Sequence, residues 1–178
     1  MVVILKIYIV RHGQTDYNIE ERYGGRIDVP LNEEGIKEAI EVKDKLKNIK
    51  FDLVFSSPLS RAYNTAKIIY DGDIIIDDRI IERDNGDLEG KLKSEIKDKI
   101  DFNVDKNNIY NIESITSFRD RINNFFDDIT NNNKDKTILV VTHAGVGIYV
   151  RCYFEGEPLN NDYSTYKMSN GEILEYEL

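Results

Sequence analysis

The sequence contains few of the residues that build disulfides, metal sites and redox centres. Among its 178 residues there is one cysteine (Cys152), there are two histidines (His12 and His143), and there is no tryptophan. A single cysteine excludes a disulfide framework and any Cys-x-x-Cys metal or redox pair. A zinc centre would need both histidines together with carboxylates. We therefore expect neither a bound metal nor a cofactor.

Long hydrophobic runs and an excess of positive charge are also missing. The apolar segment 1–10 is too short to span a membrane and is interrupted by Lys6. It has no preceding basic segment and no small-residue cleavage site, so it does not resemble a signal peptide. The formal net charge of −9 disfavours broad contact with nucleic acids or anionic membranes. These features predict a cytoplasmic protein that binds neither nucleic acid nor membrane.

The remaining composition is that of one folded domain. Hydrophobic residues make up 40% of the chain, and the mean hydropathy is −0.48. A chain of this length is expected to form a single domain, residues 1–178, as a monomer or a homodimer. Segment 91–112 is rich in lysine and asparagine and has weak periodicity. We expect it to be an insertion or a lid.

Apolar periodicity predicts strands that alternate with helices. The predicted strands are 2–10, 53–56, 74–76, 80–81 and 137–142, and the predicted helices are 32–48, 58–70, 114–129 and 144–154. Segments 163–168 and 172–176 are predicted to form a hairpin that turns at 169–171. Alternating strands and helices favour parallel pairing. The sequence therefore predicts a layered α/β domain with a mostly parallel sheet.

The two histidines follow the two strongest predicted strands. The first strand leads into Arg11-His12-Gly13, and the second leads into Thr142-His143-Ala144-Gly145. Ligands of such folds bind at the carboxyl ends of the strands. Neutral imidazole is a good nucleophile towards phosphorus near pH 7, and Arg11 and Arg61 are placed to hold phosphoryl oxygens there. For each histidine taken alone, a core or capping role is the alternative.

Several motifs, in a fixed order, resemble the histidine phosphatase superfamily, in its phosphoglycerate mutase-like branch. They are Arg11-His12-Gly13-Gln14-Thr15 with Asn18, residues 22–31, residues 56–62, Glu82 with Gly86, Glu89 and Gly90, Glu113-Ser114 with Phe118 and Arg121, and residues 142–145. Each motif alone is a weak signal. The ordered set extends over nearly the whole chain and is specific.

This resemblance implies a three-layer, phosphoglycerate mutase-like fold and a two-step reaction. His12 would attack phosphorus and become a phosphohistidine. Glu82 would protonate the leaving oxygen and then activate water. The resemblance also implies contacts to the phosphoryl group and the rest of the substrate from Arg11, Arg61, His143, Asn18, Gly25 and Ala144. No metal is required, because fixed cations supply the positive charge.

The general acid is the assignment that the residues alone support least. Segment 82–90 contains four carboxylates and, without the resemblance, is equally typical of a solvated loop. A general acid needs a carboxyl group in a pocket. Glu82 alone directly follows the apolar pair Ile80-Ile81, which makes it the first candidate. Asp84 is the second, and Glu89 is expected to brace the loop.

Three activities are compatible with these residues. The first is hydrolysis of a small phosphorylated metabolite, since the chain is similar to α-ribazole phosphatases and broad-specificity phosphatases. The second is phosphoglycerate mutase activity, and the third is phosphate binding without catalysis. A mutase needs a basic lid, but segment 91–112 contains no arginine, and Asp98, Asp101 and Asp105 offset its lysines. This composition favours hydrolysis and, by the same reasoning, a lightly charged monophosphate.

Overall fold

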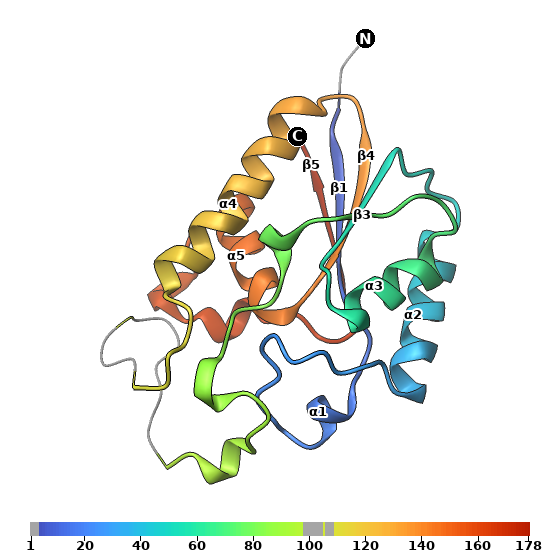
Figure 1. The fold of residues 1–178 in the computed structure, drawn as a ribbon. Coiled ribbons are helices and arrows are strands. Elements are labelled where there is room, and N and C mark those ends of the chain that lie inside the picture. The colour runs from blue at the N-terminus through green and yellow to red at the C-terminus, as the bar shows by residue number, and fades with distance from the viewer. Residues whose placement is uncertain (1–3, 98–104, 106–108) are drawn as a thin grey trace.

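The central sheet of the protein carries helices on both faces (Figure 1), in a computed structural model that describes residues 4–97, 105 and 109–178. Its strands are β1 (Lys6–Arg11), β2 (Leu53–Ser56), β3 (Ile75–Ile76), β4 (Thr137–Thr142) and β5 (Ile173–Glu177). The α-helices are α1 (Asp16–Ile19), α2 (Glu33–Leu46), α3 (Ser60–Ile69), α4 (Ile115–Asn132) and α5 (Ala144–Glu155). Short 3-10 helices are η1 (Asp78–Ile80), η2 (Gly86–Leu88), η3 (Lys93–Glu95), η4 (Leu159–Asn161) and η5 (Tyr163–Tyr166). The predicted three-layer α/β fold is confirmed.

The strands lie in the order β3-β2-β4-β1-β5. Strands β1 and β4 are parallel, as are β4 and β2, and β2 and β3, whereas β5 runs antiparallel to β1. The parallel strands β1, β2 and β4 are almost fully buried, which explains why their sequences are continuous apolar runs. Their carboxyl ends meet at the lower edge of the sheet in Figure 1.

Two hydrophobic layers hold the helices to the sheet, because successive side chains of a strand point to opposite faces. Residues Ile7, Ile9, Ile138 and Val140 pack with side chains of α4 and α5. Residues Tyr8, Val10, Leu139 and Val141 pack with side chains of α2 and α3. The apolar face of α4 is buried through Phe118, Ile122, Phe125, Phe126 and Ile129, whereas Ile115 at its start is only partly buried. The alternating side chains of the strands thus pack against the apolar faces of the helices on both sides of the sheet.

Helix starts follow local capping chemistry. The Asn32 side chain accepts the Gly35 N–H at 2.9 Å and so caps α2. The Ser114 hydroxyl accepts the Ser117 N–H at 3.0 Å at the start of α4. Helix α3 begins at Ser60, later than the predicted start at Pro58.

The predicted strand 80–81 is wrong. Ile80 ends the 3-10 helix η1, whose start is capped by the Asp77 side chain. Its carbonyl accepts a hydrogen bond from the Thr142 hydroxyl (2.8 Å), and the Ile81 carbonyl accepts one from Arg121 (2.7 Å). Side chains therefore bind the carbonyl groups that a neighbouring strand would have bound. The apolar pair that predicted a strand consists of Ile80, which is buried in the core, and the half-buried Ile81.

The predicted hairpin is also wrong. Residues 163–166 form η5, in which the Asp162 side chain accepts the Ser164 N–H. The predicted second arm is β5, and its partner is β1. The turn at 169–171 does exist: Glu172 N–H donates to the Ser169 carbonyl, and Gly171 has a φ of +66°. The turn at 169–171 was predicted correctly, but the strand that follows it pairs with the distant, buried β1 and not with the segment before the turn.

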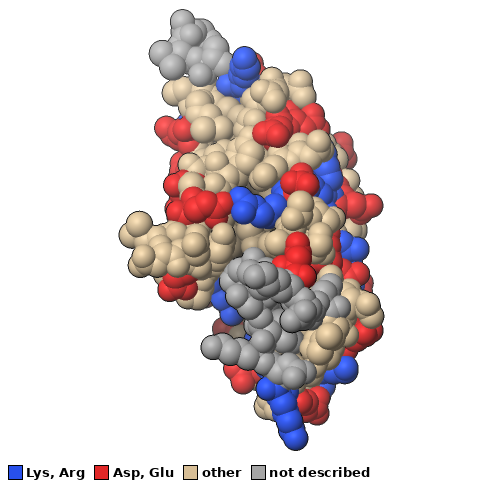
Figure 2. Space-filling model, turned by 90° about the vertical axis from the view of Figure 1, so that its left-hand side faces the viewer, with Lys and Arg blue, Asp and Glu red and all other residues tan. Residues whose placement is uncertain are grey.

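Much of the predicted lid, 91–112, lies outside the described residues. Its described start pairs with another loop, because Leu92 forms an isolated bridge with Arg22. Within the described chain no helix is long and apolar enough to cross a membrane. Acidic and basic side chains are interspersed on the face drawn in Figure 2.

Candidate active site

A pocket of about 300 Å³ opens at the carboxyl edge of the parallel strands. His12, Arg61 and Glu82 line it, together with the three predicted substrate contacts Asn18, Gly25 and Ala144. Arg11 and His143 do not line the pocket but are buried beside His12: the rings of the two histidines are 5.1 Å apart between centroids. The structure thus brings all eight predicted site residues to one edge of the sheet.

His12 is held rigidly at the end of β1. Its backbone N–H donates to the Thr142 carbonyl at 2.9 Å, which extends the pairing of β1 with β4. Its Nδ1 lies 2.7 Å from the Gly13 carbonyl oxygen. Because a carbonyl oxygen only accepts hydrogen bonds, Nδ1 carries the proton and Nε2 has the free lone pair. The ring is therefore in the tautomer that a nucleophilic Nε2 requires.

Gly13 follows His12 where the loop passes very close to α2. A Cβ atom at this position would lie 2.2 Å from the Gly35 carbonyl oxygen, so only glycine fits. The Gly13 N–H donates to the Thr65 hydroxyl of α3 at 3.1 Å. This close packing fixes the backbone that presents His12.

Both histidines are neutral at physiological pH. Burial lowers the pKa of His12 well below its usual value of 6.5, and the charges of Arg61 and Arg11 lower it further. Burial also lowers the pKa of His143, and Arg61, His12 and Arg11 add to this effect. A neutral imidazole keeps the lone pair that attack on phosphorus needs.

His143 is oriented by Ser57, which follows β2. His143 is the N-cap residue of α5, and its Nε2 lies 2.6 Å from the Ser57 hydroxyl oxygen. Its Nδ1 and the Nε of Arg11 are buried and have no hydrogen-bond partner among the described residues. Both atoms therefore have unused hydrogen-bonding capacity in the buried layer beside His12.

The two buried arginines are held by main-chain carbonyl groups. Arg11 donates from Nη1 to the Met168 carbonyl at 2.7 Å. Arg61 donates to the carbonyls of Ile27 (2.8 Å) and Gly25 (2.7 Å), and Gly25 has a φ of +52°. These neutral partners orient the guanidinium groups without cancelling their charge. Arg61 lines the pocket and Arg11 is buried beside His12, so both preoriented charges attract an anion in the pocket.

Glu82 faces these cations from the neighbouring segment. One carboxyl oxygen accepts the Gly145 N–H at 3.1 Å, and the other accepts the Arg83 N–H at 2.9 Å. A Cβ at position 145 would lie 2.4 Å from the Glu82 carboxyl, so Gly145 makes room for it. Asp84, the second candidate for the acid, does not line the pocket; its carboxylate accepts the Gly86 N–H at 2.7 Å.

The loop carboxylate Glu89 braces the backbone, as expected. It accepts the N–H groups of Arg26 (2.7 Å) and Asn85 (3.1 Å). Asn18 accepts the Thr15 N–H at 3.0 Å in the capping box of α1 and reaches the pocket from that helix.

The sequence did not predict the other pocket residues as site residues, although Tyr23 and Phe118 belong to its motifs. The pocket is also lined by two lysines and by four aromatic side chains, which are Lys93, Lys167, Tyr17, Tyr23, Phe118 and Tyr149. They come from segments far apart along the chain, so spacing does not connect them. Ser57 belongs to the motif at residues 56–62. Its contact with His143 could not be predicted, because it depends on how the ends of β2 and β4 meet. Within the described part of the chain, no three His, Cys, Asp or Glu side chains are grouped to hold a metal ion.

Comparison of the sequence with protein-family models identifies the class of protein to which the chain belongs. The model of the histidine phosphatase superfamily (branch 1) matches residues 7–178. The chain therefore belongs to this superfamily, and its relatives include phosphatases, so it is a phosphatase enzyme.

Individual relatives cover most of the chain. The uncharacterized phosphatase PhoE of Bacillus subtilis is 33% identical over 142 residues, which are 78% of this chain and 71% of PhoE. Phosphoserine phosphatase 1 of Hydrogenobacter thermophilus is 32% identical over 151 residues, 79% of this chain and 72% of that protein. An Escherichia coli structure assigned provisionally as an alpha-ribazole-5'-P phosphatase has the same fold, with a TM-score of 0.84 and 24% identity over 96% of this chain and 89% of that one.

Proposed function

We propose that the protein is a metal-independent phosphomonoesterase that hydrolyses a small phosphorylated metabolite through a phosphohistidine at His12. The observation that carries this proposal is the state of His12. It is a buried, neutral imidazole whose Nδ1 is bound by the Gly13 carbonyl and whose neighbours are the cations Arg11 and Arg61. This arrangement supplies a nucleophile and the charge needed to bind a phosphoryl group.

In the first step, Nε2 of His12 attacks phosphorus and the bond from phosphorus to the leaving oxygen breaks. Arg11, Arg61 and His143 hold the phosphoryl oxygens, and protonated Glu82 gives its proton to the leaving oxygen. In the second step, Glu82 takes a proton from water as the water oxygen attacks phosphorus. The nitrogen–phosphorus bond breaks, and neutral His12, protonated Glu82 and inorganic phosphate result.

The pocket favours a metabolite that carries a second anionic group. Lys93 and Lys167 line it. Burial lowers the pKa of Lys167, and the charges of Lys93 and Arg11 lower it further, so these cations repel one another. A carboxylate on the substrate would relieve this repulsion. The two lysines therefore favour a monophosphate that also carries a carboxylate, such as 3-phosphoglycerate or O-phosphoserine, the latter being the basis of a relative's name, over the lightly charged ester suggested by the composition of 91–112.

The test is phosphate release from a panel of monophosphates in the presence of excess EDTA. The panel contains O-phosphoserine, 3-phosphoglycerate, α-ribazole phosphate and p-nitrophenyl phosphate. We expect chelator-resistant release and, after a rapid quench with labelled substrate, an acid-labile and base-stable phosphoprotein that His12→Ala does not form. Loss of activity in EDTA with recovery on adding a divalent metal would contradict the mechanism.

The mutase alternative is tested in the same preparation. The enzyme is incubated with 3-phosphoglycerate and a trace of the bisphosphate, and both isomerisation and free phosphate are followed. We expect phosphate release to dominate. Isomerisation that greatly outpaces release would identify a phosphoryl transferase.

A further inference from the structure

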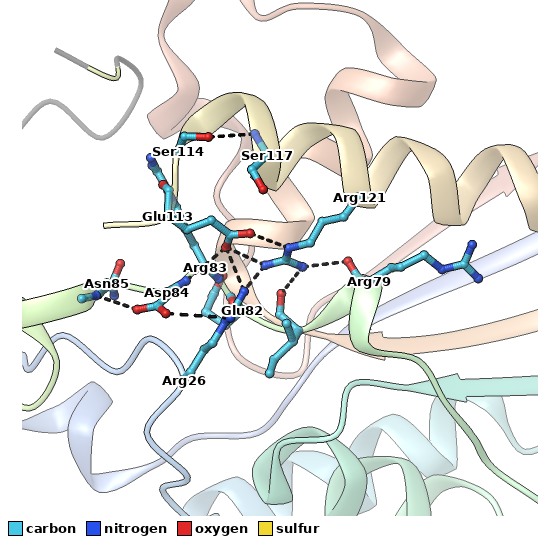
Figure 3. A network of polar contacts seen from close by, with 12 residues as sticks. Arg26, Arg79, Glu82, Arg83, Asp84, Asn85, Glu113, Ser114, Ser117 and Arg121 are labelled. Carbon is cyan, nitrogen blue, oxygen red and sulfur yellow. Dashed lines mark hydrogen bonds and ion pairs between the residues drawn. The ribbon is translucent and has the colours of Figure 1, made fainter. Parts of the chain in front are cut away.

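The segment that carries Glu82 does not belong to the sheet and forms no backbone pairing with a strand of the described chain. Glu82 lies between η1 and η2, and a side chain of α4, Arg121, binds the backbone of this segment at three carbonyls (Figure 3). The Arg121 guanidinium donates to the carbonyls of Arg79 (2.7 Å), Ile81 (2.7 Å) and Glu82 (3.1 Å). It therefore binds the main chain of Glu82 and of the residues before it.

Arg121 is itself fixed by Glu113. Its Nε donates to one Glu113 carboxylate oxygen at 2.8 Å, and its Nη2 donates to the other at 2.9 Å. An arginine has five N–H groups, and these two bonds together with the three carbonyl contacts use all five. The guanidinium also lies over the Phe118 ring, 4.7 Å from its centroid. The orientation of Arg121 is fully determined.

Glu113 is the anion at the centre of this network. Burial alone would raise the pKa of its carboxyl, but the hydrogen bonds and charge of Arg121 outweigh burial and lower the pKa. Glu113 also accepts the Asp84 N–H at 3.3 Å and a hydrogen bond from Arg26 at 3.2 Å. It is thus an ionised acceptor that holds arginines and backbone, and it has no proton to give.

Arg26 joins the network to the phosphate side of the pocket. Its side chain contacts Glu113 and, at 3.4 Å, the Glu82 carbonyl. It directly follows Gly25, whose carbonyl binds Arg61. One continuous set of contacts therefore runs from the arginine that faces phosphate to the backbone of the candidate acid.

We propose that Arg121, with Glu113 and Arg26, positions Glu82 for proton transfer to the leaving oxygen. This inference rests on the proposed function above. Arg121 acts through the backbone of Glu82 and touches no reacting atom, so it is a positioning residue. Without it, the carboxyl of Glu82 loses its alignment with the leaving oxygen, while His12 stays at the end of β1 and Arg11 and Arg61 keep their own carbonyl partners.

The loss should therefore depend on the leaving group. An alkoxide is a poor leaving group and needs its proton during bond cleavage, whereas an activated phenolate leaves without one. We expect Arg121→Met to lower kcat/KM for O-phosphoserine by about 10²-fold, the size of effect that a misplacement of about 1 Å produces. For p-nitrophenyl phosphate the loss should stay within a factor of about three. The ratio kcat/KM is used because it reports formation of the phosphoenzyme.

The matched control is Arg119→Met, on the same helix. Arg119 pairs with Glu157 at 2.5 Å, lies over the Tyr149 ring and makes none of the carbonyl contacts of Arg121. Its replacement should leave the ratio of the two kcat/KM values unchanged. Vanadate inhibition, which reports the phosphate side, should be the same for both variants and the wild type.

A double-mutant test separates positioning from general stability. In a Glu82→Gln background, Arg121→Met should add little further loss on O-phosphoserine, because the proton donor is already absent. Equal losses on both substrates, or a full additional loss in that background, would overturn the inference.

If Arg121→Met does not fold, Arg26→Met and Glu113→Gln provide the same comparison. If wild type forms no phosphohistidine, the proposed function itself fails, whereas normal phosphoenzyme with no leaving-group effect defeats only this inference.

Discussion

The two sides of the pocket are built by different means. The phosphate side carries His12 and His143 at the ends of the adjacent strands β1 and β4, where main-chain hydrogen bonds position them. The acid side carries Glu82 on an irregular segment, whose carbonyl groups bind the side chains of Arg121 and Arg26. The position of the nucleophile therefore depends on strand pairing, whereas the position of the segment that carries the acid depends on a few side-chain contacts.

The largest effect should come from removing the nucleophile itself. His12→Ala should lower turnover of p-nitrophenyl phosphate by at least about 10³-fold, since loss of a covalent nucleophile costs this much or more. The substrate is one whose leaving group needs no proton, so the loss reports the phosphate side alone. Near-normal turnover of the alanine variant, measured by release of nitrophenolate, would refute the role of His12.

Glu82→Gln should give the opposite pattern. Glutamine keeps the shape but cannot donate an acidic proton, so kcat/KM should fall about 10²- to 10⁴-fold on O-phosphoserine and much less on p-nitrophenyl phosphate. Asp84→Asn is the matched control, because Asp84 lies in the same segment but does not line the pocket. A larger effect from Asp84→Asn would move the acid to that residue.

A smaller effect is expected from Gly145→Ala. The new Cβ would approach the Glu82 carboxyl to 2.4 Å and push it aside. We expect a loss of about tenfold in kcat/KM, confined to O-phosphoserine, because only the acid is displaced. Gly24→Ala is the control: it also lines the pocket, yet its Cβ would meet nothing within 4 Å. Equal losses on the aryl substrate would show that the substitution disturbs the phosphate side as well.

The smallest effect is expected in the dependence of the free energy of unfolding on pH. Both histidines have a folded-state pKa well below 6.5, so below pH 6.5 the unfolded chain binds more protons. Stability should fall as pH falls below 6.5, by up to about 1.4 kcal/mol per pH unit for each histidine, until the folded-state pKa is reached. The lowered pKa of Glu113 acts only below 4.5, which separates the two sides of the pocket.

Urea unfolding between pH 7.5 and pH 5.5 measures this slope. His12→Asn should reduce it, while Glu113→Gln should leave it unchanged in this range. An unchanged slope in His12→Asn would show that His12 is not held neutral by the fold.

Much of the phosphate side could be predicted from the sequence, because it depends on where strongly apolar strands end. Residues His12 and His143 follow such strands directly, and parallel strands bring their carboxyl ends together. The acid could be ranked because Glu82 directly follows the apolar pair Ile80-Ile81, although this pair forms no strand. The contacts of Arg121 could not be predicted, since they depend on how α4 docks on a segment with no regular structure. The misassigned strand at 80–81 has the same cause: its backbone groups bind side chains from distant parts of the chain.

The place of β1 in the middle of the sheet has a consequence for folding. During synthesis β1 leaves the ribosome long before its partners β4 and β5, which lie far from it along the chain. Contacts so distant along the chain slow folding and leave an apolar edge unpaired in the meantime. The apolar β1 is therefore the segment of a nascent or refolding chain most exposed to aggregation. Activity should return only in the last kinetic phase of refolding, when β1 is enclosed on both sides.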